Sequence, residues 1–177
     1  ESICRCSTLY ECLHAKSMWY NFYGPHRKAN DPLGGDDLIF TPDIMVFKSD
    51  TESPVLLDQS QWLVCSVISC AAPDLRPDPK TGRRINISND RLKELHIKRI
   101  RNILSVAAAN GCQVMILGAF GCGTNRNPPE VVASAMKEAV EEFKYCFETI
   151  EFAVFCEPRD EENYEVFNRI LGSENNT

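Results

Sequence analysis

Apolar residues gather in short runs that are typical of β-strands. These runs cover residues 38–42, 44–47, 62–70, 114–117 and 148–155. The first two predict a strand or a hairpin pair, with Pro42 at a bend or at a sheet edge. The run 114–117 consists of four consecutive apolar residues, which favours a strand that is covered on both faces.

Between and after these runs, apolar residues recur at the spacing of an α-helix. We predict helices over residues 1–16, 91–110, 128–144 and 161–171. Asn89 or Asp90 is expected to cap the second of these, and Gly111 to end it. Its apolar stripe comprises Leu92, Leu95, Ile100, Ile103, Leu104 and Ala107. Its basic residues Arg91, Lys98, Arg99 and Arg101 are interpreted as a solvated face.

Residues 18–37 begin with aromatic side chains and continue with Gly, Pro and Asn, which predicts a long loop. The aromatic residues are Trp19, Tyr20, Phe22 and Tyr23. We interpret them as packing in a core or a lid rather than as a platform on which bases stack.

Strands that alternate with helices in the second half of the chain indicate an α/β fold, with a sheet covered on both faces. Ligands of such folds bind at the carboxyl ends of the strands. Three segments are expected at those ends: residues 71–73, the glycine-rich stretch that begins at Gly118, and residues 157–158.

The composition is that of one globular domain of 177 residues, with no apolar run long enough to cross a bilayer and no visible signal peptide. A net charge of −6 argues against a broad groove for nucleic acid, so we expect no direct nucleic-acid partner and no membrane partner. The nine cysteines form no C-x-x-C pair, and their odd number together with the absence of a secretion signal favours a reducing, cytoplasmic setting. With only three scattered histidines, a Cys/His zinc site is not expected.

Residues 118–127, the glycine loop, connect the strand 114–117 to the next predicted helix. Gly118, Gly121 and Gly123 permit positive φ and leave room beside the backbone. Asn127 is expected to cap the helix, with Pro128 at its first position. Backbone N–H groups and a helix N-terminus directed at one point suit a phosphate group. A tight turn without a ligand is the alternative.

Two common nucleotide-binding motifs do not fit the glycine loop. A P-loop would end in Gly-Lys-Ser/Thr, whereas the loop continues as Gly-Thr-Asn-Arg-Asn. The glycines follow the order G-x-x-G-x-G rather than the G-x-G-x-x-G of dinucleotide-binding folds. A P-loop ATPase and a nicotinamide dehydrogenase are therefore not predicted.

Three stretches together resemble a known family. Residues 1–10 read E-x-x-C-R-x-S-x-L-Y, residues 69–73 end in Ala-Ala-Pro, and residues 117–129 read L-G-A-F-G-C-G-x-N-x-N-x-P. Residues 152–155 and 163–167 are similar to a closing strand and helix. On these motifs the chain resembles the microbial-type poly(ADP-ribose) glycohydrolases, whose catalytic domain is a macro domain. The resemblance reaches nearly from end to end of the chain, and it implies one such domain over residues 1–177.

The chain departs from the pattern of that family in two ways. The family's GGG loop and the leading Gln-Glu of its QEE motif do not occur, and the chain begins where the second Glu would stand. In that alignment Glu1 matches the catalytic acid. Asn125 replaces an aromatic residue that is expected to pack against the distal ribose.

The resemblance implies a macro-domain-like, three-layer α/β/α fold with a mixed sheet, and a glycosidase that releases ADP-ribose from poly(ADP-ribose) or from an ADP-ribosylated protein. Glu1 would act as general acid and base, and neither a metal nor a cofactor is required. The diphosphate would contact Gly118, Ala119, Phe120, Gly121, Cys122, Gly123, Thr124 and Asn125. The adenosine side would comprise Ala72, Pro73, Phe155 and Asn163.

Two alternatives to the hydrolase stay open at this point. One is a module that binds ADP-ribose without cleaving it, and the other is a scaffold without a ligand, which leaves the glycine loop unexplained. Cys122 invites interpretation as a nucleophile, but no histidine adjoins it in sequence, and the resemblance implies a packing role. Arg126 is expected either near phosphate or in water.

Overall fold

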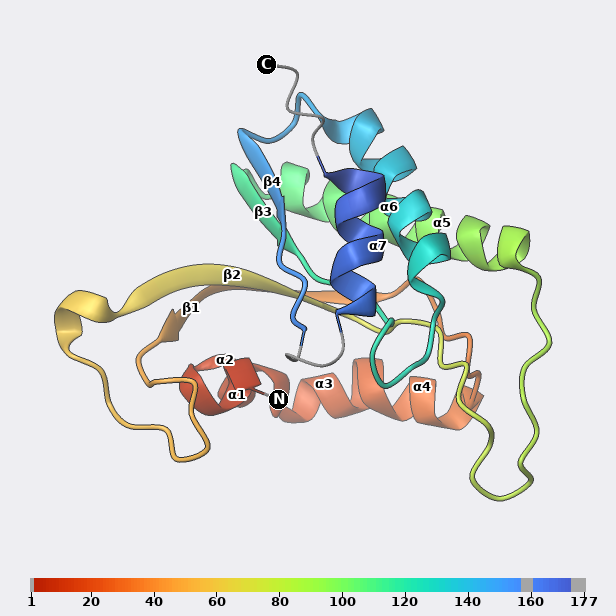
Figure 1. Ribbon diagram of the computed structural model, residues 1–177. Coiled ribbons are helices and arrows are strands. Elements are labelled where there is room, and N and C mark those ends of the chain that lie inside the picture. The colour runs from red at the N-terminus through yellow and green to blue at the C-terminus, as the bar shows by residue number, and fades with distance from the viewer. Residues whose placement is uncertain (1, 157–160, 173–177) are drawn as a thin grey trace, which may run out of the picture. The chain divides into compact units, whose positions relative to one another are not determined.

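The computed structural model describes residues 2–156 and 161–172. Their contacts form two compact units (Figure 1). The first unit comprises residues 1–31 and 37–70, and the second comprises residues 32–36 and 71–177. Among the described residues, no helix is long and apolar enough to cross a membrane.

The first unit is built on an antiparallel pair of strands, β1 (Leu38–Val46) and β2 (Leu63–Cys70). Its helical elements are α1 (Ser2–Cys6), α2 (Leu9–Leu13), α3 (Lys16–Met18), η1 (Trp19–Tyr23), α4 (Gly24–Ala29) and the short η2 (Gln59–Gln61). Cys6 joins the N-terminal helices to β1, because its carbonyl accepts from the N–H groups of Phe47 at 2.9 Å and Lys48 at 3.1 Å. Cys6, Leu9 and Ile44 are buried in the core of this unit.

The two runs predicted over 38–47 form one strand with an irregularity at Pro42. Thr41 pairs with Val67 and Ile44 with Cys65, so two residues of β1 lie opposite one residue of β2. Asp43 adopts a φ of 51° there. A proline cannot donate a ladder hydrogen bond, which explains why the extra residue is placed beside Pro42. This register shift, in a sheet of two described strands, agrees with the expectation of Pro42 at a bend or at a sheet edge.

The loop predicted over 18–37 is wrong for its first half, because residues 16–29 are helical throughout. The residues Gly24 and Pro25, which indicated a loop, lie inside this helix. The helix accommodates them by widening into a π-turn at η1, in which the N–H of Gly24 donates to the carbonyl of Trp19. A Cβ on residue 24 would lie 2.8 Å from that carbonyl oxygen, so the turn requires glycine.

The second unit contains α5 (Asn89–Ala109), β3 (Val114–Leu117), α6 (Pro129–Phe143), β4 (Thr149–Phe152) and α7 (Glu162–Leu171). Strands β3 and β4 are parallel, and α6 packs against both α5 and α7. The buried residues of α6 are mostly small, which lets the neighbouring helices approach closely. Every helix and strand predicted beyond residue 89 is present; β3 has the predicted bounds, and the ends of the other elements are shifted by no more than three residues.

The sheets are smaller than predicted. The described strands form two separate two-stranded sheets, so the structure confirms a mixed α/β fold but not a single large sheet. The prediction that 114–117 is covered on both faces is also wrong for the described residues. Met115 and Leu117 are buried, whereas Val114 and Ile116 are exposed, which is the alternation of a strand packed on one face.

Candidate functional site

The glycine loop leaves the end of β3 and reaches α6 through a series of tight turns. The N–H of Cys122 donates to the carbonyl of Ala119 at 3.0 Å, and that of Arg126 to the carbonyl of Gly123 at 2.9 Å. Positive φ occurs at Gly121 (80°) and at Arg126 (59°), but not at Gly118 or Gly123. Of the three glycines expected to use positive φ, only Gly121 does so.

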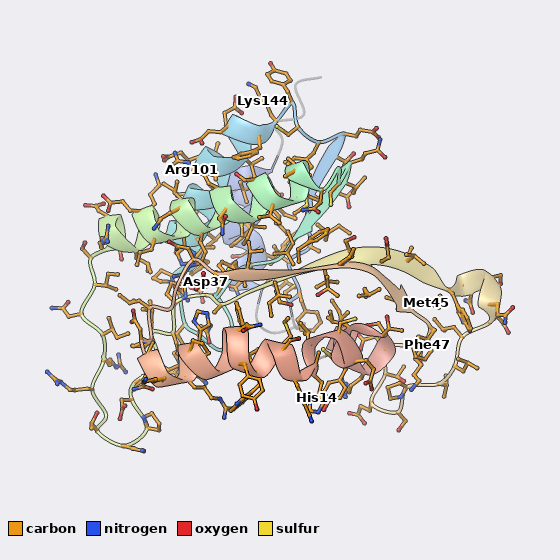
Figure 2. The ribbon with its side chains drawn as sticks, turned by 180° about the vertical axis from the view of Figure 1, so that it is seen from behind. His14, Asp37, Met45, Phe47, Arg101 and Lys144 are labelled. Atoms are coloured by element: carbon orange, nitrogen blue, oxygen red, sulfur yellow. The ribbon has the colours of Figure 1, made fainter. Side chains whose placement is uncertain are left out.

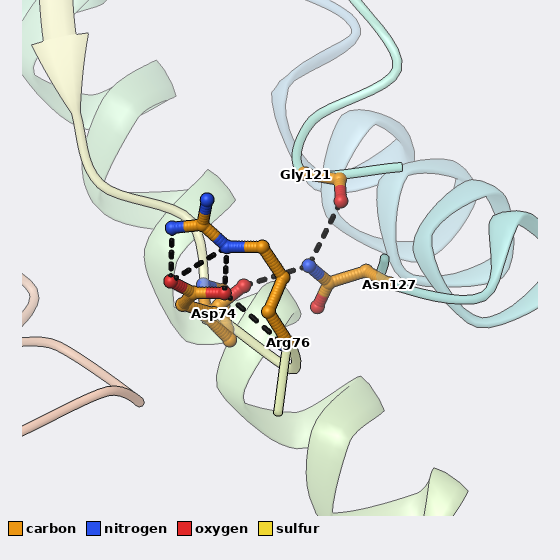
Figure 3. Close-up of polar contacts among 5 residues, drawn as sticks. Asp74, Arg76, Gly121 and Asn127 are labelled. Carbon is orange, nitrogen blue, oxygen red and sulfur yellow. Dashed lines mark hydrogen bonds and ion pairs between the residues drawn. The ribbon is translucent and has the colours of Figure 1, made fainter. Parts of the chain in front are cut away.

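The side chain of Asn127 fixes the loop from inside and does not cap α6. It is 2% exposed, and its Nδ2 donates to the carbonyls of Pro73 at 2.7 Å and Gly121 at 3.0 Å (Figure 3). Its own N–H donates to the same Gly121 carbonyl at 3.0 Å. The N-cap of α6 is Pro128, without a side-chain cap. The predicted cap is therefore wrong, because buried carbonyls compete successfully for this amide.

His96, a buried residue of α5, completes the anchor. Its Nε2 lies 3.0 Å from Oδ1 of Asn127. Because Nδ2 of Asn127 faces two carbonyls, Oδ1 must accept, and Nε2 must carry the proton. Nδ1 has no partner among the described residues. A neutral ring carries a single proton, so Nδ1 is the unprotonated nitrogen. Burial lowers the pKa of His96, since a charged ring in this position would lose its hydration.

The ring of Phe120 packs edge-on against His96, with 5.9 Å between the ring centroids. The imidazole thus contacts the loop at Phe120 and at Asn127, on both sides of the central glycines. Sequence reasoning did not single out His96, although its place on the apolar stripe of α5 was a signal that it is buried.

Arg99 holds the chain that follows β2, next to the segment that Asn127 contacts. Its guanidinium donates to the carbonyls of Ala71 at 2.9 Å, Leu33 at 2.8 Å and Gly34 at 3.2 Å. Its Nε lies 3.5 Å from Oδ1 of Asp36. The side chain is 1% exposed, so the interpretation of Arg99 as part of a solvated face is wrong. Only an arginine fork can reach these carbonyls at once.

Two further contacts order residues 71–76, one with the glycine loop and one within the segment. The N–H of Leu75 donates to the carbonyl of Asn125 at 3.0 Å, which fixes the far side of the glycine loop. Asp74 forms a two-pronged ion pair with Arg76, at 2.8 and 2.6 Å (Figure 3). This arginine holds the pKa of the Asp74 carboxyl below its usual range.

The loop presents backbone donors that the rest of the described chain leaves unused. The N–H groups of Gly121, Gly123, Thr124 and Asn125 donate to no acceptor among the described residues. A Cβ on Gly123 would meet no atom within 4 Å, so the space beside this residue is open. At Gly121, by contrast, a Cβ would lie 2.7 Å from that of Ala72. The loop is therefore closed on the side of Ala72 and open at Gly123.

Cys122 does not have the properties of a nucleophile. Burial, and to a lesser extent the charge of Glu130, raises the pKa of its thiol to about 12. A thiol with this pKa is protonated at neutral pH, and the thiolate is the reactive form. This pKa argues against covalent catalysis by Cys122 and agrees with a packing role between the two glycines.

The structure brings some of the predicted site residues together and leaves others apart. Ala72 and Pro73 contact the glycine loop through Gly121 and Asn127. Phe155 is 84% exposed, and Asn163 lies half-buried in the first turn of α7. No hydrogen bond or ring contact among the described residues joins either of them to the loop. Glu1 and residues 157–158 lie outside the described residues.

Comparison with known proteins finds similarity to poly(ADP-ribose) glycohydrolases. Residues 1–49 match the family model described as microbial-type PARG, catalytic domain. The structure of poly(ADP-ribose) glycohydrolase from Deinococcus radiodurans in complex with ADP-ribose superposes with a TM-score of 0.79 at 28% identity, over 97% of this chain and 66% of that one. No curated protein matches the chain.

Two structures from Thermomonospora curvata are similarly close. Its poly(ADP-ribose) glycohydrolase gives a TM-score of 0.83 at 26% identity, over 97% of this chain and 59% of that one. The form bound to the inhibitor ADP-HPD gives 0.79 at 25% identity, over 95% and 60%. The chain thus spans 59–66% of the length of these structural relatives, which is less than two thirds. These matches confirm the resemblance to the microbial-type PARG catalytic domain.

Proposed function

We propose that this chain forms the ADP-ribose-binding part of a poly(ADP-ribose) glycohydrolase-like hydrolase, with the glycine loop holding the diphosphate. Its fold would be the three-layer α/β/α arrangement of a macro domain, with a mixed sheet. The proposal is supported by the similarity to structures of such enzymes with ADP-ribose and with ADP-HPD. It assigns the binding of ADP-ribose, which those structures contain or mimic, to the glycine loop of this chain.

The observation that carries the proposal is the group of unused backbone donors in the glycine loop. N–H groups that point at one place stabilise an anion without a cationic side chain. In an acidic chain such groups supply local positive potential where the net charge does not. Asn127 supports this arrangement, because it holds the Gly121 carbonyl on the inner side. A carbonyl turned outward would repel a phosphate oxygen.

The cleavage step would use Glu1 as a general acid and base. Its carboxyl would donate a proton to the departing ribose oxygen as the bond from the anomeric carbon to that oxygen breaks. Water would then add its hydroxide to the oxocarbenium-like carbon and return a proton to the carboxylate. A diphosphate oxygen of the substrate would position this water. The role of Glu1 rests on the sequence alignment alone.

Ala72, Pro73, Phe155 and Asn163 remain the proposed adenosine side. Ala72 and Pro73 have support from their place against the glycine loop. Phe155 offers an exposed ring on which a base could stack. The hydrogen-bonding side chain of Asn163 is proposed for the adenine edge.

Calorimetric titration of ADP-ribose into the protein tests the binding step. We expect binding in the wild type and in Gly123→Gln, and at least a tenfold weaker affinity in Gly123→Glu. Both side chains enter open space, so they differ in charge and hardly in bulk. Equal affinities for the two variants would show that the diphosphate does not lie beside Gly123. A folded wild type that does not bind would refute the proposal.

An assay of ADP-ribose release then separates the hydrolase from a module that only binds. Release by the wild type, lost in Glu1→Gln with binding retained, supports the hydrolase. Binding of ADP-ribose with no release from poly(ADP-ribose) or from an ADP-ribosylated protein favours the non-catalytic alternative.

A further inference from the structure

The helix formed by residues 16–29 has two unlike faces. Its inner face carries Met18, Phe22, Tyr23 and His26, which are half-buried. Phe22 contacts the rings of Tyr23 and His26, and Nε2 of His26 lies 3.3 Å from a carboxylate oxygen of Asp37. This face is the one that packs within the first unit.

The outer face combines exposed aromatic rings with positive charge. Trp19 is 48% exposed and Tyr20 is 74% exposed, so the expectation of core packing is wrong for these two residues. Lys16, Arg27 and Lys28 are exposed on the same helix, and the guanidinium of Arg27 lies 5.2 Å from the centre of the Trp19 ring. We call these five residues the aromatic–basic face.

The charge of this helix is opposite to that of the whole chain. Residues 16–30 contain three basic residues and no acidic one, whereas the chain carries a net charge of −6. The exposed aromatics thus lie on a positive segment of an acidic protein. Aromatic platforms flanked by cations bind single-stranded polyanions that carry bases, since the rings stack on bases and the cations pair with phosphates.

A second exposed aromatic residue of the chain lacks this combination. Tyr145 is 91% exposed and has Lys144 5.3 Å from its ring centre. However, Glu141 pairs with Lys144, and Glu142 and Glu148 lie nearby in sequence. The carboxylates would repel a polyanion, which makes Tyr145 a matched control for the aromatic–basic face.

We propose that the aromatic–basic face is a second binding site that takes further units of a poly(ADP-ribose) chain. Each unit of this polymer supplies an adenine that can stack and two phosphates that can pair with cations. The inference rests on the proposed function and adds to it a place where polymer units beyond the one in the glycine loop would bind. Trp19 and Tyr20 would stack on adenine, and Lys16, Arg27 and Lys28 would contact phosphate.

Binding of poly(ADP-ribose) and of monomeric ADP-ribose to the whole chain, measured side by side, tests this inference. We expect the double variant Trp19→Ala/Tyr20→Ala to weaken polymer binding at least about fivefold, as the loss of one stacked base would. Arg27→Gln/Lys28→Gln should weaken it as well and should reduce its dependence on salt. Neither variant should change the affinity for the monomer, and Tyr145→Ala should change neither affinity.

Each contrary result points to a different failure. If the monomer binds and the Trp19/Tyr20 variant retains full polymer affinity, the second site is refuted and the proposed function stands. If neither ligand binds the folded wild type, the proposed function fails, and the inference fails with it. If a single-stranded RNA of equal charge binds as tightly and loses affinity in the same variants, the face recognises nucleic acid, which overturns the assignment to poly(ADP-ribose).

Discussion

Replacing Asn127 by alanine removes the anchor of the glycine loop. The wild-type side chain makes three hydrogen bonds, to His96, Pro73 and Gly121, and it is almost fully buried. After the substitution the Gly121 carbonyl keeps its bond from the backbone N–H of residue 127. Nε2–H of His96 and the carbonyl of Pro73 lose their partners in a place that water reaches poorly.

The magnitude follows from these two groups. An unpaired buried donor or acceptor costs about 1–3 kcal/mol. With two such groups, Asn127→Ala should lower the free energy of unfolding by about 2–6 kcal/mol. Asn110→Ala is the matched control, because this exposed amide makes one local hydrogen bond, to the carbonyl of Val106 at 2.8 Å. Its loss should cost about 0.5 kcal/mol or less.

Urea-induced unfolding followed by circular dichroism measures both variants, and calorimetry with ADP-ribose measures the state of the loop. If the loop holds the diphosphate, Asn127→Ala should also bind ADP-ribose at least tenfold more weakly at a temperature at which it is folded. A loss of stability below about 1 kcal/mol, no larger than that of Asn110→Ala, would refute the reasoning that Asn127 fixes the loop.

Three further results are expected. Gly121→Ala should destabilise the protein by about 2 kcal/mol or more, because φ is positive there and its Cβ would lie 2.6 Å from Nδ2 of Asn127, whereas Gly123→Ala should have little effect on thermal unfolding. Burial lowers the pKa of His96 in the folded state below the 6.5 of a free histidine, so the unfolded chain takes up this proton at a higher pH than the folded chain does. The stability that His96 contributes is therefore present above pH 6.5 and is lost as the pH falls below it, so the free energy of unfolding should be lower at about pH 5.5 than at about pH 7.5. His96→Gln, which keeps a donor for Asn127, should show a smaller loss in urea titrations at these two pH values. Iodoacetamide at pH 8 should modify Cys122 far more slowly than the exposed Cys146 in peptide mass spectra, because the pKa of the half-buried Cys122 thiol is about 12, and equal rates would contradict this value.

The order of elements in the second unit could be predicted from the sequence, because each signal there is local. The strand 114–117 is a continuous apolar run, and Gly111 ends α5 with a φ of 72°. Periodicity also marked the apolar stripe of α5. The same pattern did not reveal that Arg99 lies on the buried side, since a buried arginine depends on carbonyls that are distant in sequence.

The errors arise where tertiary partners overrule local preference. Asn127 has the position of a helix cap, yet its amide is occupied by His96 and Pro73 from other segments and by the Gly121 carbonyl of its own loop. Gly24 and Pro25 indicate a loop, yet a π-turn keeps them inside a helix. Both are cases in which a residue type permits two structures and the surrounding chain selects one. The glycines of the candidate site are a strong local signal, so the site could be predicted from the sequence. Its anchor, formed by Asn127 and His96, could not be predicted, because it depends on contacts between distant segments.

The two proposed sites would attract anions by different interactions, although the chain has a net charge of −6. The glycine loop offers uncharged N–H dipoles that the described residues leave unused, held in place by Asn127 and by a neutral His96. Dipoles act at short range, so they can bind an anion in an acidic protein with little attraction from a distance. The aromatic–basic face instead uses formal charges at the surface, where their field reaches about 8–10 Å into physiological salt. The net charge argues against a broad groove for polyanions, but it does not exclude either of these local arrangements.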